Sequence, residues 1–61
     1  LNVDKVLSLF DISESRKKHF KAVLDHGFVD AAKITGSKYA TVKKDYEIVR
    51  QILRDNKGRY L

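Results

Sequence analysis

Hydrophobic residues recur at intervals of three and four along most of the chain, which is the spacing of one face of an α-helix. No stretch sustains the alternation of apolar and polar residues that is typical of a strand. The sequence contains no proline, and its glycines stand only at positions 27, 36 and 58, where they mark the ends of helical segments. The pattern therefore predicts an all-α protein: a small three- to four-helix bundle with a long C-terminal helix.

The first half of the chain predicts two helices. A short amphipathic helix is expected near the N-terminus, with Asn2 as its N-cap and an apolar face formed by Val3, Val6, Leu7 and Phe10. Asp11 followed by Glu14 resembles a capping box and predicts the start of the next helix. That helix is expected to bury Phe20, Val23 and Leu24, to expose Lys17, Lys18 and Lys21, and to end in a left-handed cap at Gly27.

The second half predicts a short helix and a long one. The short helix ends at Gly36, and its apolar side is expected to contain Phe28, Val29, Ala32 and Ile34. The long helix is expected to run from about residue 38 to residue 56. Its apolar stripe consists of Tyr39, Val42, Tyr46, Val49 and Leu53, widened by Ile48 and Ile52. The tail from residue 55 to residue 61 contains a helix-ending glycine and is expected to fray.

Length and composition exclude several classes of protein. A chain of 61 residues forms at most one domain, here residues 1–61, which we expect to be a fragment of a larger protein. It has no cysteine for a disulfide and no Cys/His cluster for a structural zinc. No apolar run approaches the roughly 20 residues of a membrane span, and no signal-peptide pattern is present, so we expect no membrane partner and an intracellular location.

The net charge of +5 is concentrated in the second half of the chain. Residues 1–30 contain five basic and five acidic side chains, whereas residues 31–61 contain eight basic and three acidic ones. Such asymmetry indicates a polyanionic partner, with nucleic acid as the first candidate and an anionic membrane surface as the second. The alternative is a solvated, lysine-rich surface without a specific partner.

The segment from residue 27 to residue 42 resembles a helix-turn-helix. Ala32, Gly36 and the pair Thr41-Val42 stand at the spacing of that family, in the form found in transposases, phage small-terminase subunits and sigma-factor region-4-like domains. Two helices that cross over a tight turn need a small residue at the crossing and a positive φ in the turn, which Ala32 and Gly36 can supply. Ser37 and Asp45 depart from the pattern, because the family usually has apolar residues there.

The resemblance implies a helix-turn-helix core at residues 28–54 that binds double-stranded DNA. The helix at about residues 38–56 would be the recognition helix, with its N-terminal part in the major groove. The side chains that fall off the apolar stripe are Lys38, Ala40, Lys43, Lys44, Glu47, Arg50 and Arg54. The candidate DNA-binding residues are Ser37, Lys38, Tyr39, Thr41, Lys43, Lys44 and Arg50. Lysine dominates them, which favours phosphate attraction over base discrimination, so one copy would have modest sequence specificity.

The sequence also bears on three other functions. The apolar stripe of the last helix is wide enough for a protein-interaction or homo-oligomerisation module, and the basic face could bind RNA. An enzyme is not expected: the titratable candidates His19, His26, Asp25 and Asp30 form no recognisable catalytic or metal-ligating motif. The two histidines are expected to be surface or boundary residues near a helix C-terminus. We therefore predict no catalytic residue, no metal and no cofactor. The parent protein would be a transcription regulator, a recombinase, or a phage packaging or replication protein.

Overall fold

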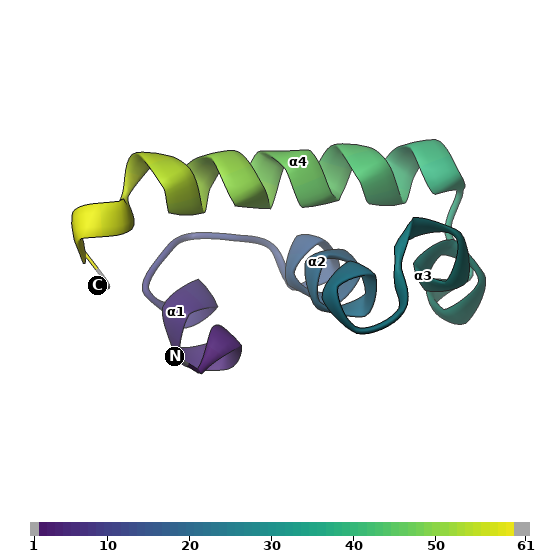
Figure 1. Ribbon diagram of the computed structural model, residues 1–61, viewed down its shortest axis with the longest axis horizontal. Coiled ribbons are helices and arrows are strands. Elements are labelled where there is room, and N and C mark those ends of the chain that lie inside the picture. The colour runs from purple at the N-terminus through teal and green to yellow at the C-terminus, as the bar shows by residue number, and fades with distance from the viewer. Residues whose placement is uncertain (1, 60–61) are drawn as a thin grey trace.

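The computed structural model describes residues 2–59 and consists of four α-helices and one 3-10 turn in that range (Figure 1). The elements are α1 (Val3–Ser8), α2 (Glu14–His26), α3 (Phe28–Thr35), α4 (Tyr39–Asp55) and η1 (Lys57–Arg59). No strand occurs between residues 2 and 59, and the predicted all-α fold is confirmed. Within the same residues, no helix is both long enough and apolar enough to cross a membrane.

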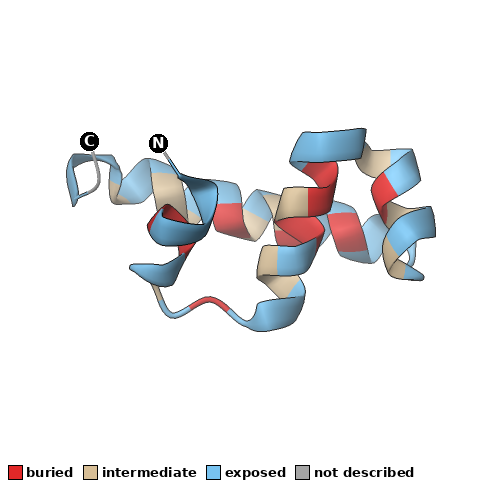
Figure 2. Ribbon diagram, turned by 90° about the horizontal axis from the view of Figure 1, so that it is seen from below, coloured by how far each residue is buried: buried red, intermediate tan, exposed pale blue. Residues whose placement is uncertain are grey.

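The long helix α4 has the other three helices on one side only. Figure 1 shows α4 along the longest axis of the molecule, with α1, α2 and α3 all below it. The view from below in Figure 2 shows that α2 and α3 run across α4 rather than along it. The opposite side of α4 is therefore not covered by any helix of the described chain.

The start of α1 follows the prediction. The Asn2 side-chain oxygen accepts hydrogen bonds from the backbone N–H groups of Asp4 and Lys5, at 2.9 and 3.3 Å. Lys21 of α2 donates a hydrogen bond of 2.5 Å to Asp4, which links α2 to α1. This hydrogen bond, together with the negative charge of Asp4, raises the pKa of Lys21 above its ordinary value.

The predicted capping box of α2 is wrong. Ser13, not Asp11, is the N-cap, and its hydroxyl accepts a hydrogen bond of 3.3 Å from the backbone N–H of Arg16. Glu14 is the first residue of the helix rather than its third. The reason is Ile12, which is only 6 % exposed and packs into the core between α1 and α2. Its burial leaves Ser13 as the last residue before the helical turn.

The core has two clusters, and Tyr46 joins them. The first cluster contains Leu7 of α1, Ile12 of the connection between α1 and α2, Phe20 of α2 and Val49 of α4. The second cluster contains Ala22 and Val23 of α2, Ala31 of α3 and Val42 of α4. The Tyr46 ring stacks on Phe20 and meets Phe28 edge-on, both at 5.1 Å between ring centroids. The centre of the apolar stripe of α4 is thus buried inside its own domain (Figure 2).

Five residues predicted to lie on the apolar sides of their helices are on the surface. Val3 and Tyr39 are 38 and 49 % exposed. Leu24, Val29 and Ile34 are 50, 58 and 60 % exposed, respectively. In α3 the fully buried residue is Ala31, whereas its neighbour Ala32 is half-buried. Because α3 is in contact with both α2 and α4, only its narrow alanine side fits between them, and the larger apolar side chains are turned outwards.

The C-terminal tail is more ordered than the sequence suggested, up to the last described residue. Residues 57–59 form a 3-10 turn, and the Arg59 guanidinium lies 5.6 Å from the centre of the Phe10 ring. This is the geometry of a cation–π contact. The predicted fraying of residues 60 and 61 lies outside the described residues.

The turn between α3 and α4 consists of residues 36–38. Gly36 has φ 67° and ψ 24°, the left-handed conformation that the sequence predicted. The left-handed cap predicted at Gly27 is wrong: its φ is 85° but its ψ is 172°, because the chain enters α3 at the very next residue and Gly27 is also the N-cap of α3. The backbone N–H of Ser37 donates to the carbonyl of Ala32 at 3.0 Å, which closes the C-terminus of α3. The chain therefore leaves α3 through a glycine-dependent cap and enters α4 three residues later.

Replacing Gly36 with alanine should lower the free energy of unfolding by about 1–2 kcal/mol, the usual penalty for a Cβ in the left-handed region. A Cβ at Gly36 would meet no atom within 4 Å, so the whole penalty comes from the backbone conformation. Urea denaturation followed by circular dichroism measures the change. Gly58→Ala is the matched control, since Gly58 has no positive φ and open space around it. Equal losses in both variants would contradict the assignment.

Candidate nucleic-acid interface

The burial of two valines fixes which side of α4 faces outwards. Val42 and Val49 are both 0 % exposed. A helix turns by about 100° per residue, so the residues two positions before and after each valine point away from the core. These residues are Ala40, Lys44, Glu47 and Gln51, and all of them are exposed. We call these four residues the outer face of α4.

A row of basic side chains lies along one edge of the outer face. Lys43 and Arg50 are seven residues apart and Arg54 follows four residues later, so all three share one side of the helix. All three are exposed. Lys44, on the outer face itself, lies about 100° around the helix from Lys43. We call Lys43, Arg50 and Arg54 the basic edge.

The N-terminus of α4 lies at the end of the outer face. Lys38 is the N-cap residue, is exposed, and makes no side-chain capping hydrogen bond. The first N–H groups of a helix attract anions, and a lysine beside them adds to that attraction. Thr41 is also exposed, whereas Tyr39 is 49 % exposed with its ring 6.1 Å from that of Phe28. Tyr39 therefore packs on the core with one side and presents the other to solvent.

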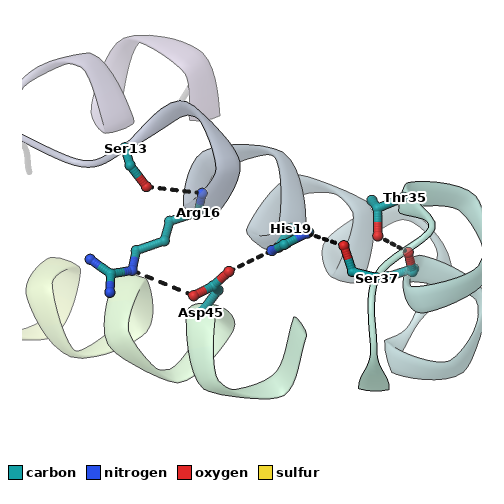
Figure 3. A network of polar contacts seen from close by, with 7 residues as sticks. Ser13, Arg16, His19, Thr35, Ser37 and Asp45 are labelled. Carbon is teal, nitrogen blue, oxygen red and sulfur yellow. Dashed lines mark hydrogen bonds and ion pairs between the residues drawn. The ribbon is translucent and has the colours of Figure 1, made fainter. Parts of the chain in front are cut away.

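Ser37 belongs to a buried hydrogen-bonded network rather than to the open surface. Figure 3 shows its hydroxyl directed at His19 of α2, with 2.8 Å between Ser37 Oγ and His19 Nε2. The other ring nitrogen, His19 Nδ1, lies 2.5 Å from Asp45 Oδ2 of α4. Arg16 Nε approaches the second oxygen of Asp45 at 3.4 Å. His19 thus connects α2 both to the turn and to α4.

The direction of one hydrogen bond in the network follows from chemistry. An ionised carboxylate only accepts hydrogen bonds, so His19 Nδ1 must carry the hydrogen that it shares with Asp45. The Ser37 hydroxyl can donate to Nε2 or accept from it, according to the charge of the ring. Because His19 and Asp45 are only 7 and 9 % exposed, these bonds satisfy groups that would otherwise be buried without partners.

The prediction that His19 lies at the surface or its boundary is wrong, because the residue is only 7 % exposed. The buried histidine ring forms hydrogen bonds with both residues that depart from the helix-turn-helix pattern, Ser37 and Asp45. Two polar residues at positions expected to be apolar were the signal that could have found it, since buried polar groups need a partner. His26, in contrast, is exposed at the last position of α2, as expected.

A serine, a histidine and an aspartate linked by hydrogen bonds in this way also occur in the catalytic triad of serine hydrolases. In that chemistry the reacting serine's own N–H can help to hold the developing oxyanion. Here the Ser37 N–H is used by the carbonyl of Ala32, at 3.0 Å. The three residues come from α2, the turn and α4, so their hydrogen bonds join the elements that place the outer face. We therefore assign the network a structural role.

The other titratable residues form no compact site. Asp25 and Asp30 are exposed at the end of α2 and in the first turn of α3. Across residues 2–59, no group of three or more His, Cys, Asp or Glu side chains is arranged to hold a metal ion.

Comparison with known proteins found no match among family models, curated proteins or solved structures.

Proposed function

We propose that this chain is a DNA-binding helix-turn-helix domain in which α3 and α4 form the motif and α4 is the recognition helix. The observation that carries the proposal is the one-sided packing of α4. The helices α1, α2 and α3 lie on one side of it, and its outer face and basic edge are left open (Figure 1). A groove-binding helix needs this combination of a fixed inner side and an exposed basic side.

The connection between α3 and α4 supports the same proposal. The turn has three residues and a left-handed glycine, as helix-turn-helix turns often have. Ala31 is 0 % exposed and supplies the small side chain at the helix contact, a role that was predicted for Ala32. The two helices cross rather than forming an antiparallel hairpin (Figures 1 and 2).

Binding would depend mainly on contacts between basic side chains and DNA phosphates. Lys38 lies beside the free N–H groups of α4, and Lys43, Lys44 and Arg50 extend along the exposed helix. Tyr39 and Thr41 lie at the start of the helix, where side chains of such motifs reach base edges. We leave Ser37 out of the interface, because its hydroxyl is bonded to His19. Lysine is a point charge rather than a bidentate base reader, so we expect modest specificity for one copy.

The protein-interaction alternative depended on the apolar stripe of α4. Val42 and Val49 are fully buried in the domain itself, and Ile52 and Leu53 pack partly buried against the core cluster that contains Leu7. The stripe is thus already largely used within the chain. On α4 itself, the basic, open side remains for a partner, and its charge favours a polyanion.

A titration of fluorescently labelled duplex DNA tests the proposal. If Lys38, Lys43, Lys44 and Arg50 each neutralise one phosphate, affinity should fall about 100-fold between roughly 50 and 200 mM salt. Double-stranded RNA and single-stranded DNA of the same length are the competitors that distinguish duplex DNA from other polyanions. Absence of duplex binding at about 50 mM salt, or stronger competition by RNA, would contradict the proposed function.

A further inference from the structure

Glu47 is an acidic residue in the middle of an otherwise basic surface. It lies on the outer face, between Lys43 and Arg50 of the basic edge in sequence, and is exposed. The other acidic residues of α4 have internal partners: Asp45 binds His19, and Asp55 accepts a hydrogen bond of 2.9 Å from Gln51. Glu47 takes part in none of the ion pairs formed within residues 2–59.

Helical ion pairs and non-specific DNA binding give little reason for this carboxylate. Lys43 precedes Glu47 by four residues, the less favourable order for a helical ion pair, and Arg50 follows it by three residues in the favourable order, but Glu47 forms an ion pair with neither. On a surface that approaches DNA, a carboxylate is repelled by the phosphates and lowers affinity for every sequence. A hydrogen-bond donor in the groove that Glu47 accepts from would offset this repulsion.

The position of Glu47 on the helix would allow a hydrogen bond to a base in the groove. Glu47 stands eight residues after the start of α4, about 12 Å along the helix axis, and on the same outer face as Lys44 and Ala40. Phosphate contacts from Lys43, Lys44 and Arg50 on either side would hold the helix against the groove. The side chain between them would then point at the base edges rather than at the backbone.

We propose that Glu47 is a specificity-determining residue that selects cytosine in the major groove, an inference that rests on the proposed function. The cytosine N4 amino group is a donor that a carboxylate can accept from, whereas thymine presents an O4 acceptor at the same place. Adenine also has an amino donor, but its N7 acceptor lies beside that donor and repels a carboxylate. The carboxylate therefore lowers general affinity and discriminates against the other bases at one position.

Selection of bound duplexes from a randomised pool tests the inference. The wild-type chain should enrich cytosine at one position, and replacing that cytosine with thymine should weaken binding about 10-fold. Glu47→Gln should bind the pool more tightly and lose the cytosine preference. Asp55→Asn is the matched control, because it removes the same charge from the last residue of α4, about 12 Å along the helix axis from Glu47, and it should keep the preference.

The outcomes separate the two proposals. Failure of the wild-type chain to bind any duplex would overturn the proposed function together with this inference. Duplex binding without a cytosine preference, or an unchanged preference in Glu47→Gln, would overturn the role of Glu47 and leave the proposed function in place. Glu47 is exposed, so circular dichroism should show an unchanged helical content in the variant.

Discussion

Replacing Asp45 with alanine is expected to unfold most of the chain at room temperature. Both oxygens of Asp45 are engaged, one by His19 at 2.5 Å and one by Arg16 at 3.4 Å. Removing one partner of a buried charged hydrogen bond costs about 3–5 kcal/mol. Here the cost comes from His19, which stays buried without an acceptor for Nδ1, whereas the Arg16 side chain is 43 % exposed and can be solvated. A domain of this size has about 3–5 kcal/mol of stability in total, so the loss is comparable to the whole.

Far-UV circular dichroism and urea denaturation measure this effect. Asp45→Asn keeps the shape and one acceptor, and should lose about 1–3 kcal/mol. Asp55→Ala is the matched control: it changes the same residue type in the same helix at an exposed position, and should stay within about 0.5 kcal/mol of the wild type. An Asp45→Ala variant as stable as Asp55→Ala would show that the network does not hold α4 in place.

The double substitution Lys43→Glu with Lys44→Glu should reduce the affinity for duplex DNA by at least about 100-fold at roughly 50 mM salt. Each phosphate contact that is lost means that fewer counterions are released from the DNA on binding. Each new carboxylate also repels the phosphates. The slope of log affinity against log salt should become shallower by about 2. Fluorescence anisotropy measures both quantities, and the fold should persist because both side chains are exposed.

The control for this experiment changes charge elsewhere. Lys5→Glu with Lys18→Glu makes the same total change on α1 and α2, at exposed positions that take part in none of the ion pairs within residues 2–59. It should weaken binding far less than the α4 variant. A similar loss in both variants would mean that net charge, and not the open side of α4, accounts for the binding.

The sequence predicted the parts of the fold that depend on local spacing. The repeat of Val42, Tyr46 and Val49 identified the core side of α4, because every third or fourth residue returns to one face. Gly36 was identified as the turn because its left-handed conformation costs other residues energy. Both features need only neighbours in the chain.

Contacts between helices were harder to predict. His19, Ser37 and Asp45 come from three segments of the chain, and nothing in the spacing of any one segment brings them together. The exposure of Val29 and Ile34 likewise depends on α3 being in contact with two other helices at once. Apolar spacing identified a face of α3, but not which face the neighbours would cover.

In the candidate site too, some features could be predicted from helical spacing and others depend on how the helices pack. That Lys43, Lys44 and Arg50 avoid the apolar stripe could be predicted from helical geometry, and all three are exposed. Whether their side of the helix stays open depends on where α1 and α2 pack, which only the tertiary structure gives (Figure 1). Ser37 was a reasonable candidate by position, but its hydroxyl is used internally.

The most direct test of the account is a nuclear magnetic resonance titration of the isotopically labelled chain with a short DNA duplex at low salt. If the open side of α4 is the binding surface, the largest amide shifts should fall between Lys38 and Glu47 and extend to Arg50. The amides of α1 should shift little. Shifts concentrated in α1 and α2, with the N-terminal half of α4 unchanged, would contradict the proposal that α4 is the recognition helix.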